Sequence, residues 1–189
     1  MNHPFRPMRP GLSLSRTALG AIIDQQRGRW AFQPKLDEER AFLAFASELD
    51  ELPRLFNRHG RRLPRHKEAL FQKSAEAAAA AFPNAILDVG TLGFRTDALG
   101  RGGIVVYDVL LSGDREPWSV RRERLKALLR LPAPNLVETG GVYRLDEVMD
   151  GLALFDARLG EGIEGVIGRR LDGMYQQGDS DLMLKAKYL

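Results

Sequence analysis

The sequence predicts an α+β fold with mainly antiparallel sheets flanked by helices. Short runs rich in branched and aromatic residues predict the strands, and residues 85–94 and 104–111 flank a glycine-containing turn, as in an antiparallel hairpin. Apolar side chains recur at helical spacing over residues 118–131, and residues 66–82 form an alanine-rich run of good helix formers. The length of 189 residues fits one domain with a buried core.

The N-terminal region differs from the rest in composition. Residues 1–16 contain three prolines and three arginines but little apolar periodicity, so we expect an extended arm that precedes one domain over residues 17–189. A short helix is expected over residues 17–26, with Thr17 as its N-cap. Gly28 then ends this helix before the next strand begins.

Residues 29–40 read as an alternating strand that ends in charged side chains. Trp30, Phe32 and Pro34 share one face at period two, and burial of that face would hold Lys35 in a fixed place. Lys35 is the candidate nucleophile, provided that neighbouring cations, a metal or desolvation remove its proton. The alternative is a strand end with solvated charges.

The remaining elements are predicted from strand alternation with period two and from apolar residues at helical spacing. Further strands are expected over residues 41–46, 52–58, 136–145, 163–169 and 182–189, and a further helix over residues 146–159. In the last strand Lys185 and Lys187 are two residues apart, which sends both lysines to the same face.

Composition excludes several kinds of protein. The chain has no cysteine, which rules out disulfides and thiolate zinc sites, and its three histidines show no metal-binding spacing. No apolar run approaches the roughly 20 residues of a membrane span, and no secretory signal begins the chain. We therefore expect a cytoplasmic protein that makes no membrane contact.

The charge balance leans only weakly towards polyanionic partners. Lys and Arg total 28 against 25 Asp and Glu, a net charge of +3. The densest group of cations, called the basic cluster below, consists of Arg61, Arg62, Arg65, His66 and Lys67. It is either a solvated surface or part of a nucleic-acid interface.

Six short segments, taken in order, carry a resemblance to a known family. They are Lys35-Leu36-Asp37-Glu38-Glu39-Arg40, Asn57-Arg58-His59-Gly60, Leu87-Asp88-Val89-Gly90, Val106-Tyr107-Asp108-Val109-Leu110, Glu164-Gly165-Val166-Ile167-Gly168-Arg169 and Leu184-Lys185-Ala186-Lys187. These segments resemble the motifs K-x-D-G-x-R, S-R-x-G, L-D-G-E, V-F-D-L-L, E-G-V-V-x-K and L-K-x-K in the adenylation domain of ATP-dependent DNA ligases. The resemblance implies an ATP-grasp-like domain of the covalent nucleotidyltransferase superfamily.

The family's chemistry assigns expected roles to the matching positions. In such ligases a lysine attacks the α-phosphate of ATP, and the AMP of the resulting lysyl-AMP passes to the 5′-phosphate of a nick. The resemblance implies that Lys35 is the nucleophile, that Lys185 and Lys187 hold the α-phosphate, and that Glu164 binds Mg²⁺. The other nucleotide-binding positions that it implies are Gln33 and Tyr107 at adenine, Asp37 beside the nucleophile, and Arg40, Arg58 and Arg169 near ribose and phosphates.

The implied partners and cofactors follow from the same chemistry. They are ATP, Mg²⁺ and nicked double-stranded DNA, or RNA in its place. The resemblance also implies work in DNA repair, replication or recombination by a monomer assisted by other repair proteins.

Four positions depart from the family's motifs. Glu38 stands at the motif glycine, Gly90 at the glutamate that binds ribose and metal, Arg169 at a lysine, and Met183 at the tryptophan of the last motif. We also expect no OB-fold domain of the kind into which the family's chains continue. Two alternatives remain. One is a degenerate nucleotidyltransferase domain that binds nucleotide or nucleic acid without catalysis, and the other is an RNA ligase or capping-type enzyme that uses the same lysine.

Overall fold

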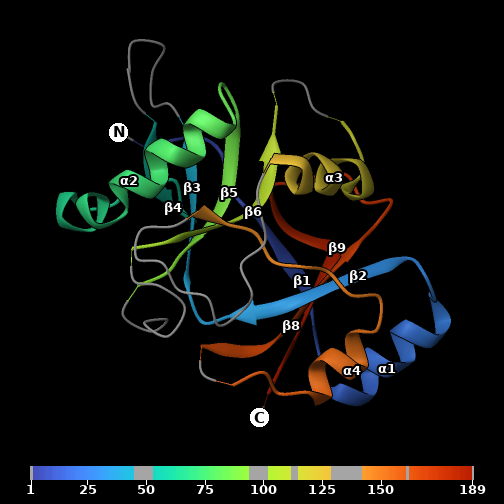
Figure 1. Ribbon diagram of the computed structural model, residues 1–189. Coiled ribbons are helices and arrows are strands. Elements are labelled where there is room, and N and C mark those ends of the chain that lie inside the picture. Colours follow the sequence, from blue (N-terminus) through green and yellow to red (C-terminus); the bar gives the residue numbers. More distant parts are fainter. Residues whose placement is uncertain are drawn as a thin grey trace. The chain divides into compact units, whose positions relative to one another are not determined.

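The computed structural model describes residues 2–44, 53–93, 102–111, 115–128, 142–160 and 162–188. The chain divides into two compact units that alternate along the sequence. Unit 1 comprises Met1–Pro7, Glu38–Asp114 and Arg121–Leu145, and unit 2 comprises Met8–Asp37, Arg115–Val120 and Asp146–Leu189. The strands of the described residues form one sheet in each unit, and most neighbouring strands are antiparallel (Figure 1). The predicted α+β class is therefore confirmed.

Unit 2 is built on a four-stranded sheet in the order β1-β9-β8-β2. Strand β8 (Ile163–Arg170) pairs antiparallel with both β2 (Trp30–Leu36) and β9 (Gly178–Lys187), and β1 (Met8–Leu14) pairs in parallel with β9. The residues predicted as an N-terminal arm thus include a strand of this sheet. Pro10 belongs to β1, which lies at the sheet edge, where a proline is tolerated.

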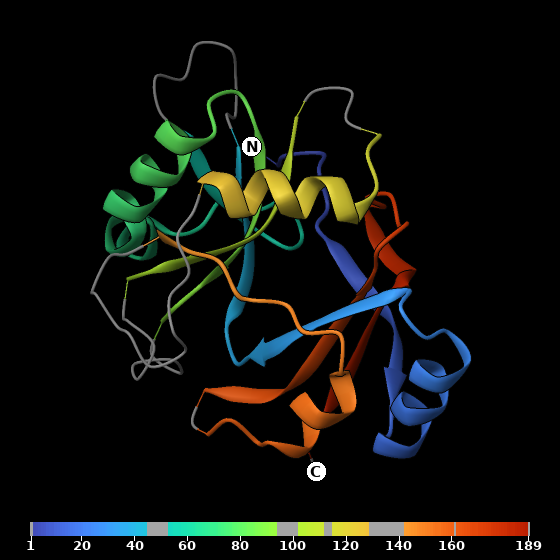
Figure 2. The ribbon, with the colours of Figure 1, turned by 45° about the vertical axis from the view of Figure 1, so that its right-hand side comes forward.

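Helices α1 (Arg16–Gln25) and α4 (Gly151–Asp156) lie side by side against one face of this sheet (Figures 1 and 2). The side chains buried between them are Leu19, Trp30, Phe32, Phe155, Val166, Leu184 and Ala186. The N-cap of α1 is Ser15, not the predicted Thr17, because the Ser15 hydroxyl accepts a hydrogen bond from the Ala18 amide at 3.2 Å.

Helix α4 is shorter than the helix predicted over residues 146–159. Val148 lies before it and exchanges two backbone hydrogen bonds with Phe32 of β2, at 2.8 and 2.9 Å. The carboxylate of Asp150 then accepts hydrogen bonds from the first amides of the helix. Pairing with β2 therefore replaces the first turns of the predicted helix.

Unit 1 contains a five-stranded sheet in the order β4-β3-β5-β6-β7. The bounds are β3 (Glu39–Ala44), β4 (Arg54–Asn57), β5 (Ile86–Thr91), β6 (Ile104–Leu110) and β7 (Val142–Tyr143). Strands β5 and β6 pair antiparallel, as the sequence predicted, and helix α2 (Arg65–Ala81) contacts β4, β6 and β7. Helix α3 (Trp118–Leu128) starts in unit 2 and continues in unit 1.

Several predicted elements extend beyond the described residues. The predicted strand over residues 136–145 is described only from 142 onwards, where β7 pairs in parallel with β6. Residues 45–46, 52, 94 and 129–131, at the ends of other predicted elements, also lie outside the description. In the described part of the chain, every helix is too short or too polar to cross a bilayer.

Candidate active site

The unit 2 sheet has one apolar face and one polar face. Trp30 and Phe32 of β2 belong to the core beneath α1 and α4. Successive side chains of a strand point to opposite faces, so Gln33 and Lys35 occupy the other face. The predicted nucleophile is therefore anchored by the burial of its neighbours, as its sequence pattern suggested.

Strand register gathers the predicted lysines on this polar face. Lys35 lies opposite Gly165, which in turn lies opposite Lys187. One step along the sheet, Gln33 and Lys185 both lie opposite Ile167. Because directly opposed residues share a face, Gln33, Lys35, Lys185 and Lys187 form a compact patch.

Glu164 reaches the same face through a β-bulge. In the pairing of β2 with β8, Lys35 lies opposite Gly165, and the next residue, Leu36, lies opposite Ile163. Glu164, between these two residues of β8, therefore has no partner in β2 and is the extra residue of the bulge. Gly165 follows with φ +148, and a Cβ there would collide with the carbonyl oxygen of Ala186. Only glycine fits beside this bulge, and the bulge turns Glu164 away from the core face.

The Glu164 carboxylate holds two of the lysines. Its Oε1 accepts a hydrogen bond from Lys35 Nζ, and its Oε2 accepts one from Lys187 Nζ at 2.7 Å. Burial raises the pKa of Glu164, but the hydrogen bonds from Lys187 and Lys35 outweigh it, so the pKa lies below its ordinary value. The side chains of Lys35, Glu164 and Lys187 are 19%, 29% and 49% exposed. We call these three residues the lysine–glutamate cluster.

The other predicted residues of unit 2 lie in different surroundings. Lys185 is half-buried and makes no ion pair within the described part of the chain, so its charge is available. Gln33 is buried, and the Asp37 amide donates to the Gly162 carbonyl at 2.8 Å. Arg169 is also buried and stacks on Trp118, with its guanidinium carbon 4.5 Å from the ring centroid.

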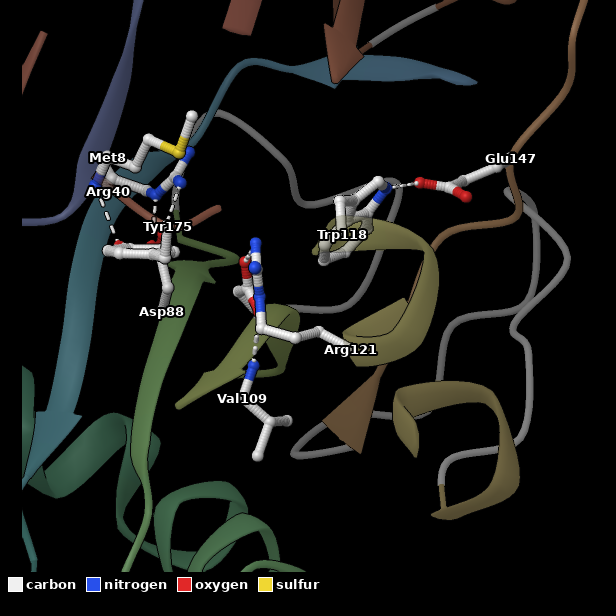
Figure 3. A network of polar contacts seen from close by, with 9 residues as sticks. Met8, Arg40, Asp88, Val109, Trp118, Arg121, Glu147 and Tyr175 are labelled. Carbon is white, nitrogen blue, oxygen red and sulfur yellow. Dashed lines mark hydrogen bonds and ion pairs between the residues drawn. The ribbon is translucent and has the colours of Figure 1, made fainter. Parts of the chain in front are cut away.

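In unit 1, Arg40 of β3 and Tyr107 of β6 lie together, although β5 separates their two strands in the sheet. Arg40 donates two hydrogen bonds to the carboxylate of Asp88, at 2.5 and 2.7 Å (Figure 3). Its guanidinium carbon also lies 4.7 Å from the Tyr107 ring centroid. This pairing fixes the guanidinium. The structure thus brings Arg40 and Tyr107 together.

Two of the motif departures meet beside Tyr107. A Cβ placed on Gly90 would lie 2.7 Å from the Tyr107 hydroxyl and 2.8 Å from both Cδ and Oε2 of Glu38. Glu38 is half-buried, and its Oε2 is buried. The Glu38 carboxylate therefore occupies the space that a side chain at position 90 would need.

A buried ion pair in unit 1 was missed by sequence reasoning. Arg121 of α3 donates to both carboxylate oxygens of Asp108 in β6, at 2.9 and 3.0 Å, and the Val109 amide donates to the same carboxylate (Figure 3). Asp108 is fully buried. An acid inside the apolar run of β6 was the available signal, because a buried carboxylate requires a charged or hydrogen-bonding partner.

The basic cluster and Arg58 are exposed in unit 1. Arg62 is bound to Glu68 at 2.8 Å, and Lys67 is bound to Glu39 at 2.6 Å. Among the described residues, Arg61 and Arg65 form no ion pair. The cluster thus contains two cations that are already neutralised locally and two that are available to an external anion.

Among the described residues, the side chain of Arg58 has one local contact, with its neighbour His59. Its Nε donates to His59 Nε2 at 3.1 Å, and both residues are exposed. Its side chain is therefore accessible to a phosphate group.

The predicted magnesium ligand offers an incomplete site. Within the residues that the structure covers, no group of three or more His, Asp or Glu side chains could enclose a metal ion. Mg²⁺ commonly takes one or two carboxylates and completes its octahedron with water and substrate phosphates. Glu164 fits such a site as a single ligand that a nucleotide would have to complete.

Comparison with known proteins gives similar solved structures. No protein-family model and no curated protein matches the chain. A mycobacterial DNA ligase D complexed with ATP and MES has a TM-score of 0.62 at 23% identity, over 97% of this chain and 60% of that chain.

Two further structures extend this similarity. A Chlorella virus DNA ligase-adenylate has a TM-score of 0.60 at 18% identity, over 96% of this chain and 68% of that chain. An archaeal ATP-dependent RNA ligase has a TM-score of 0.59 at 17% identity, over 98% of this chain and 48% of that chain. The present chain has the fold of the nucleotidyltransferase domain of ATP-dependent ligases.

Proposed function

We propose that this chain is an ATP-dependent nucleotidyltransferase that forms lysyl-AMP on Lys35 and transfers the AMP to a nucleic-acid 5′-phosphate. The observation that carries this proposal is the patch of cations on the polar face of the unit 2 sheet. Lys35 is held by Glu164 beside Lys187, and Lys185 lies one step along the same face. Two lysines on one carboxylate, with a third lysine on the same sheet face, suit a site that binds a triphosphate.

The proposed reaction begins with deprotonation of Lys35. Its Nζ then forms a bond to the α-phosphorus of ATP, while the bond from that phosphorus to the oxygen that bridges to the β-phosphate breaks. Pyrophosphate leaves with the bonding electrons, and the nitrogen releases a proton to solvent. Lys185 and Lys187 stabilise the negative charge that develops on the phosphate oxygens.

Glu164 orients the nucleophile before ATP binds. Its hydrogen bond holds Lys35 Nζ on the polar face, which restricts the direction of attack. Bound Mg²⁺ would neutralise phosphate charge, and Glu164 would be its protein ligand. Because Lys187 is half-exposed, exchanging its carboxylate partner for a phosphate carries a small desolvation cost.

The remaining predicted residues complete a proposed nucleotide site. Gln33 and Tyr107 would contact adenine, while Arg40, Arg58 and Arg169 would act near the ribose and phosphates, with Asp37 beside the nucleophile. Support for Arg40 and Tyr107 comes from their mutual stacking. For Arg169 the stack on Trp118 indicates an indirect role, because its guanidinium is buried.

Nicked duplex DNA is the proposed nucleic-acid substrate, with RNA as the alternative. In the second step an oxygen of the 5′-phosphate attacks lysyl-AMP and breaks the phosphorus–nitrogen bond. The 3′-hydroxyl then displaces AMP and closes the nick. Two of the three similar structures described above are DNA ligases and the third is an RNA ligase, so parallel assays on nicked DNA and nicked RNA decide between the two substrates.

Covalent labelling tests the proposal directly. The protein is incubated with ATP and Mg²⁺ and its intact mass is measured, with acid-labile and base-stable labelling as the chemical signature of a phosphoramidate. We expect one adenylate on the wild type and none on Lys35→Ala. Lys67→Ala is the matched control, since Lys67 is also paired with a glutamate but lies at the unit 1 surface.

The degenerate, nucleotide-binding domain is the competing function. It is favoured by Gly90, which removes a carboxylate that the family's motif carries. Nucleotide binding by the wild type without any covalent label would establish it. Equal labelling of wild type and Lys35→Ala would show instead that another residue is the nucleophile.

A further inference from the structure

An open pocket in unit 1 lies between strand β4 and the helix α2 that packs beside it (Figure 1). Its volume is about 320 Å³, and sites for small molecules commonly measure roughly 300–1,000 Å³. All of its lining residues fall within residues 53–76, so the pocket is formed by one unit. None of them is a residue of the proposed nucleotide site, so this pocket is a separate feature of the molecule.

The pocket exists because small side chains of α2 face β4. The lining positions of the helix include Arg65, Glu68, Gln72 and Glu76, whose spacing of three or four residues defines one helix face. Ala69 lies between them on this face and is exposed. Its methyl group leaves open a volume that a larger side chain would occupy.

Three arginines gather at the end of the pocket where α2 begins. Residues 61–63 pair antiparallel with β4 just before the helix, which brings the start of α2 beside Arg54, the first residue of β4. Arg62 donates hydrogen bonds to both carboxylate oxygens of Glu68, at 2.8 to 3.1 Å, so its charge is compensated. Within the described part of the chain, neither Arg54 nor Arg65 forms an ion pair.

Arg54 is the most informative of these cations because it is half-buried. Partial burial removes hydration from a charged group, and among the described residues no carboxylate replaces that hydration. Glu76, the other acid of the lining, lies about 16 Å along the helix from Arg65 by its rise per residue, and it accepts a hydrogen bond from Gln72 at 2.9 Å. The arginine end of the pocket therefore keeps two uncompensated positive charges.

We propose that this pocket binds the phosphate group of a small phosphate monoester. Such a group carries close to two negative charges at neutral pH, which matches the charges of Arg54 and Arg65. A guanidinium also presents paired donors that fit the oxygens of a phosphate. Each diester of a nucleic-acid backbone carries a single charge, and the pocket has the volume of a small-molecule site, so the monoester is the better match.

A titration followed by nuclear magnetic resonance tests the site directly and needs no turnover. The reporter is the Nε–H signal of Arg54, which is assigned by its disappearance in Arg54→Lys. We expect methyl phosphate to shift this signal to saturation and dimethyl phosphate to bind at least about tenfold more weakly, because the diester lacks the second charge. The affinity for methyl phosphate should fall as the pH is lowered through about 6, where the monoester takes up a proton.

Two pairs of variants locate the ligand. Ala69→Leu fills the pocket but keeps all three arginines, and it should weaken binding at least about tenfold. Its matched control is Ala77→Leu, since Ala77 is an exposed alanine of the same helix that does not line the pocket. Arg65→Ala should also weaken binding about tenfold or more, whereas Arg61→Ala, at a neighbouring cation outside the lining, should leave it unchanged.

The opposite results would overturn the assignment. An Arg54 signal that methyl phosphate does not shift shows that no phosphate binds in the pocket. Binding by Ala69→Leu that equals wild type shows that the arginines hold phosphate at the surface and not in the pocket. Equal affinity for dimethyl phosphate, together with displacement of methyl phosphate by nicked duplex, assigns the arginines to a nucleic-acid backbone instead. If Ala69→Leu does not fold, the comparison of Arg65→Ala with Arg61→Ala decides.

Discussion

The two units differ in how they keep their charged side chains. In unit 2, Lys35 and Lys187 share Glu164 on a sheet face where all three side chains reach solvent. In unit 1, the side chains of Asp108 and Arg121 are 0% and 3% exposed. The first arrangement joins β2, β8 and β9, and the second joins β6 to α3, yet only the first leaves its charges accessible.

This difference separates charges that hold the fold from charges that can serve chemistry. Removing one member of a buried ion pair leaves the other charge with neither that partner nor water, which costs considerable free energy. A buried pair therefore cannot readily exchange one of its members for a ligand. A half-exposed pair gains little from its own attraction and can replace a carboxylate with a phosphate at low cost. Accessibility, and not the presence of an ion pair, therefore marks the lysine–glutamate cluster as the candidate catalytic group.

The largest loss of unfolding free energy is expected when Asp108, the buried acid of unit 1, is replaced. Asp108→Ala removes the buried carboxylate to which Arg121 donates two hydrogen bonds, and loss of one member of a buried ion pair costs about 3–5 kcal/mol of unfolding free energy. Urea denaturation measures this change. The control is Asp172→Ala, whose partner Arg170 lies at the surface and whose loss should cost less than about 1 kcal/mol. Equal costs for the two variants would remove the distinction between the pairs.

A smaller loss is expected at the pair that positions Arg40. Asp88→Asn removes one charge of a bidentate pair, but the side chain of Arg40 is 17% exposed and remains stacked on Tyr107. We expect a loss of about 1–3 kcal/mol of unfolding free energy, since a hydrogen bond to a charged group is weakened and some solvation remains. A loss as large as that of Asp108→Ala would place Arg40 among the purely structural charges.

In the lysine–glutamate cluster, substitution should change stability little and the rate of labelling strongly. Glu164→Gln is expected to change the unfolding free energy by about 1 kcal/mol or less, because all three side chains are partly exposed. The same variant should slow labelling of Lys35 by at least about tenfold, because the nucleophile loses its orienting charge. A large loss of stability with unchanged labelling would make Glu164 a structural residue.

The pH dependence of stability isolates the same carboxylate. Its folded-state pKa lies below the ordinary value of 4.5, because the hydrogen bonds from Lys187 and Lys35 outweigh the effect of burial. The unfolded chain therefore takes up this proton first as the pH falls. The contribution of Glu164 is fully present above the ordinary pKa and disappears as the pH falls through the lowered one. The difference in unfolding free energy between wild type and Glu164→Gln should shrink over that range.

The smallest expected effect concerns the basic cluster, where substitution should change the salt dependence of nucleic-acid binding. This cluster contains both ion-paired cations and cations available to an external anion. If nicked duplex is the ligand, the double variant of Arg61→Ala and Arg65→Ala should lower the slope of log affinity against log salt by about 2, one for each phosphate contact. The variants Arg62→Ala and Lys67→Ala should lower it less, because Glu68 and Glu39 already neutralise these cations. An unchanged slope in all variants would identify the cluster as a solvated surface.

Most strands, and the side chains that share a face within them, could be predicted from the sequence, although β1 within the expected N-terminal arm was missed. Alternation over residues 29–40 predicted that Lys35 lies on the sheet face away from the buried Trp30 and Phe32. The spacing of Lys185 and Lys187 predicted that these two lysines share one face. These features are local, because the period of a strand depends only on adjacent residues. The six ordered segments likewise led to the ligase-like fold before any contact was known.

Tertiary structure alone decided how the strands are aligned and what fills the space between them. The bulge that turns Glu164 towards Lys35 depends on the register of β2 against β8, and the contact of Glu38 with Gly90 depends on the pairing that brings β3 beside β5. The pairing of the buried Asp108 with Arg121 likewise depends on how α3 packs against β6. Periodicity specifies the face of a side chain, whereas register and close packing arise from long-range contacts that no single segment contains.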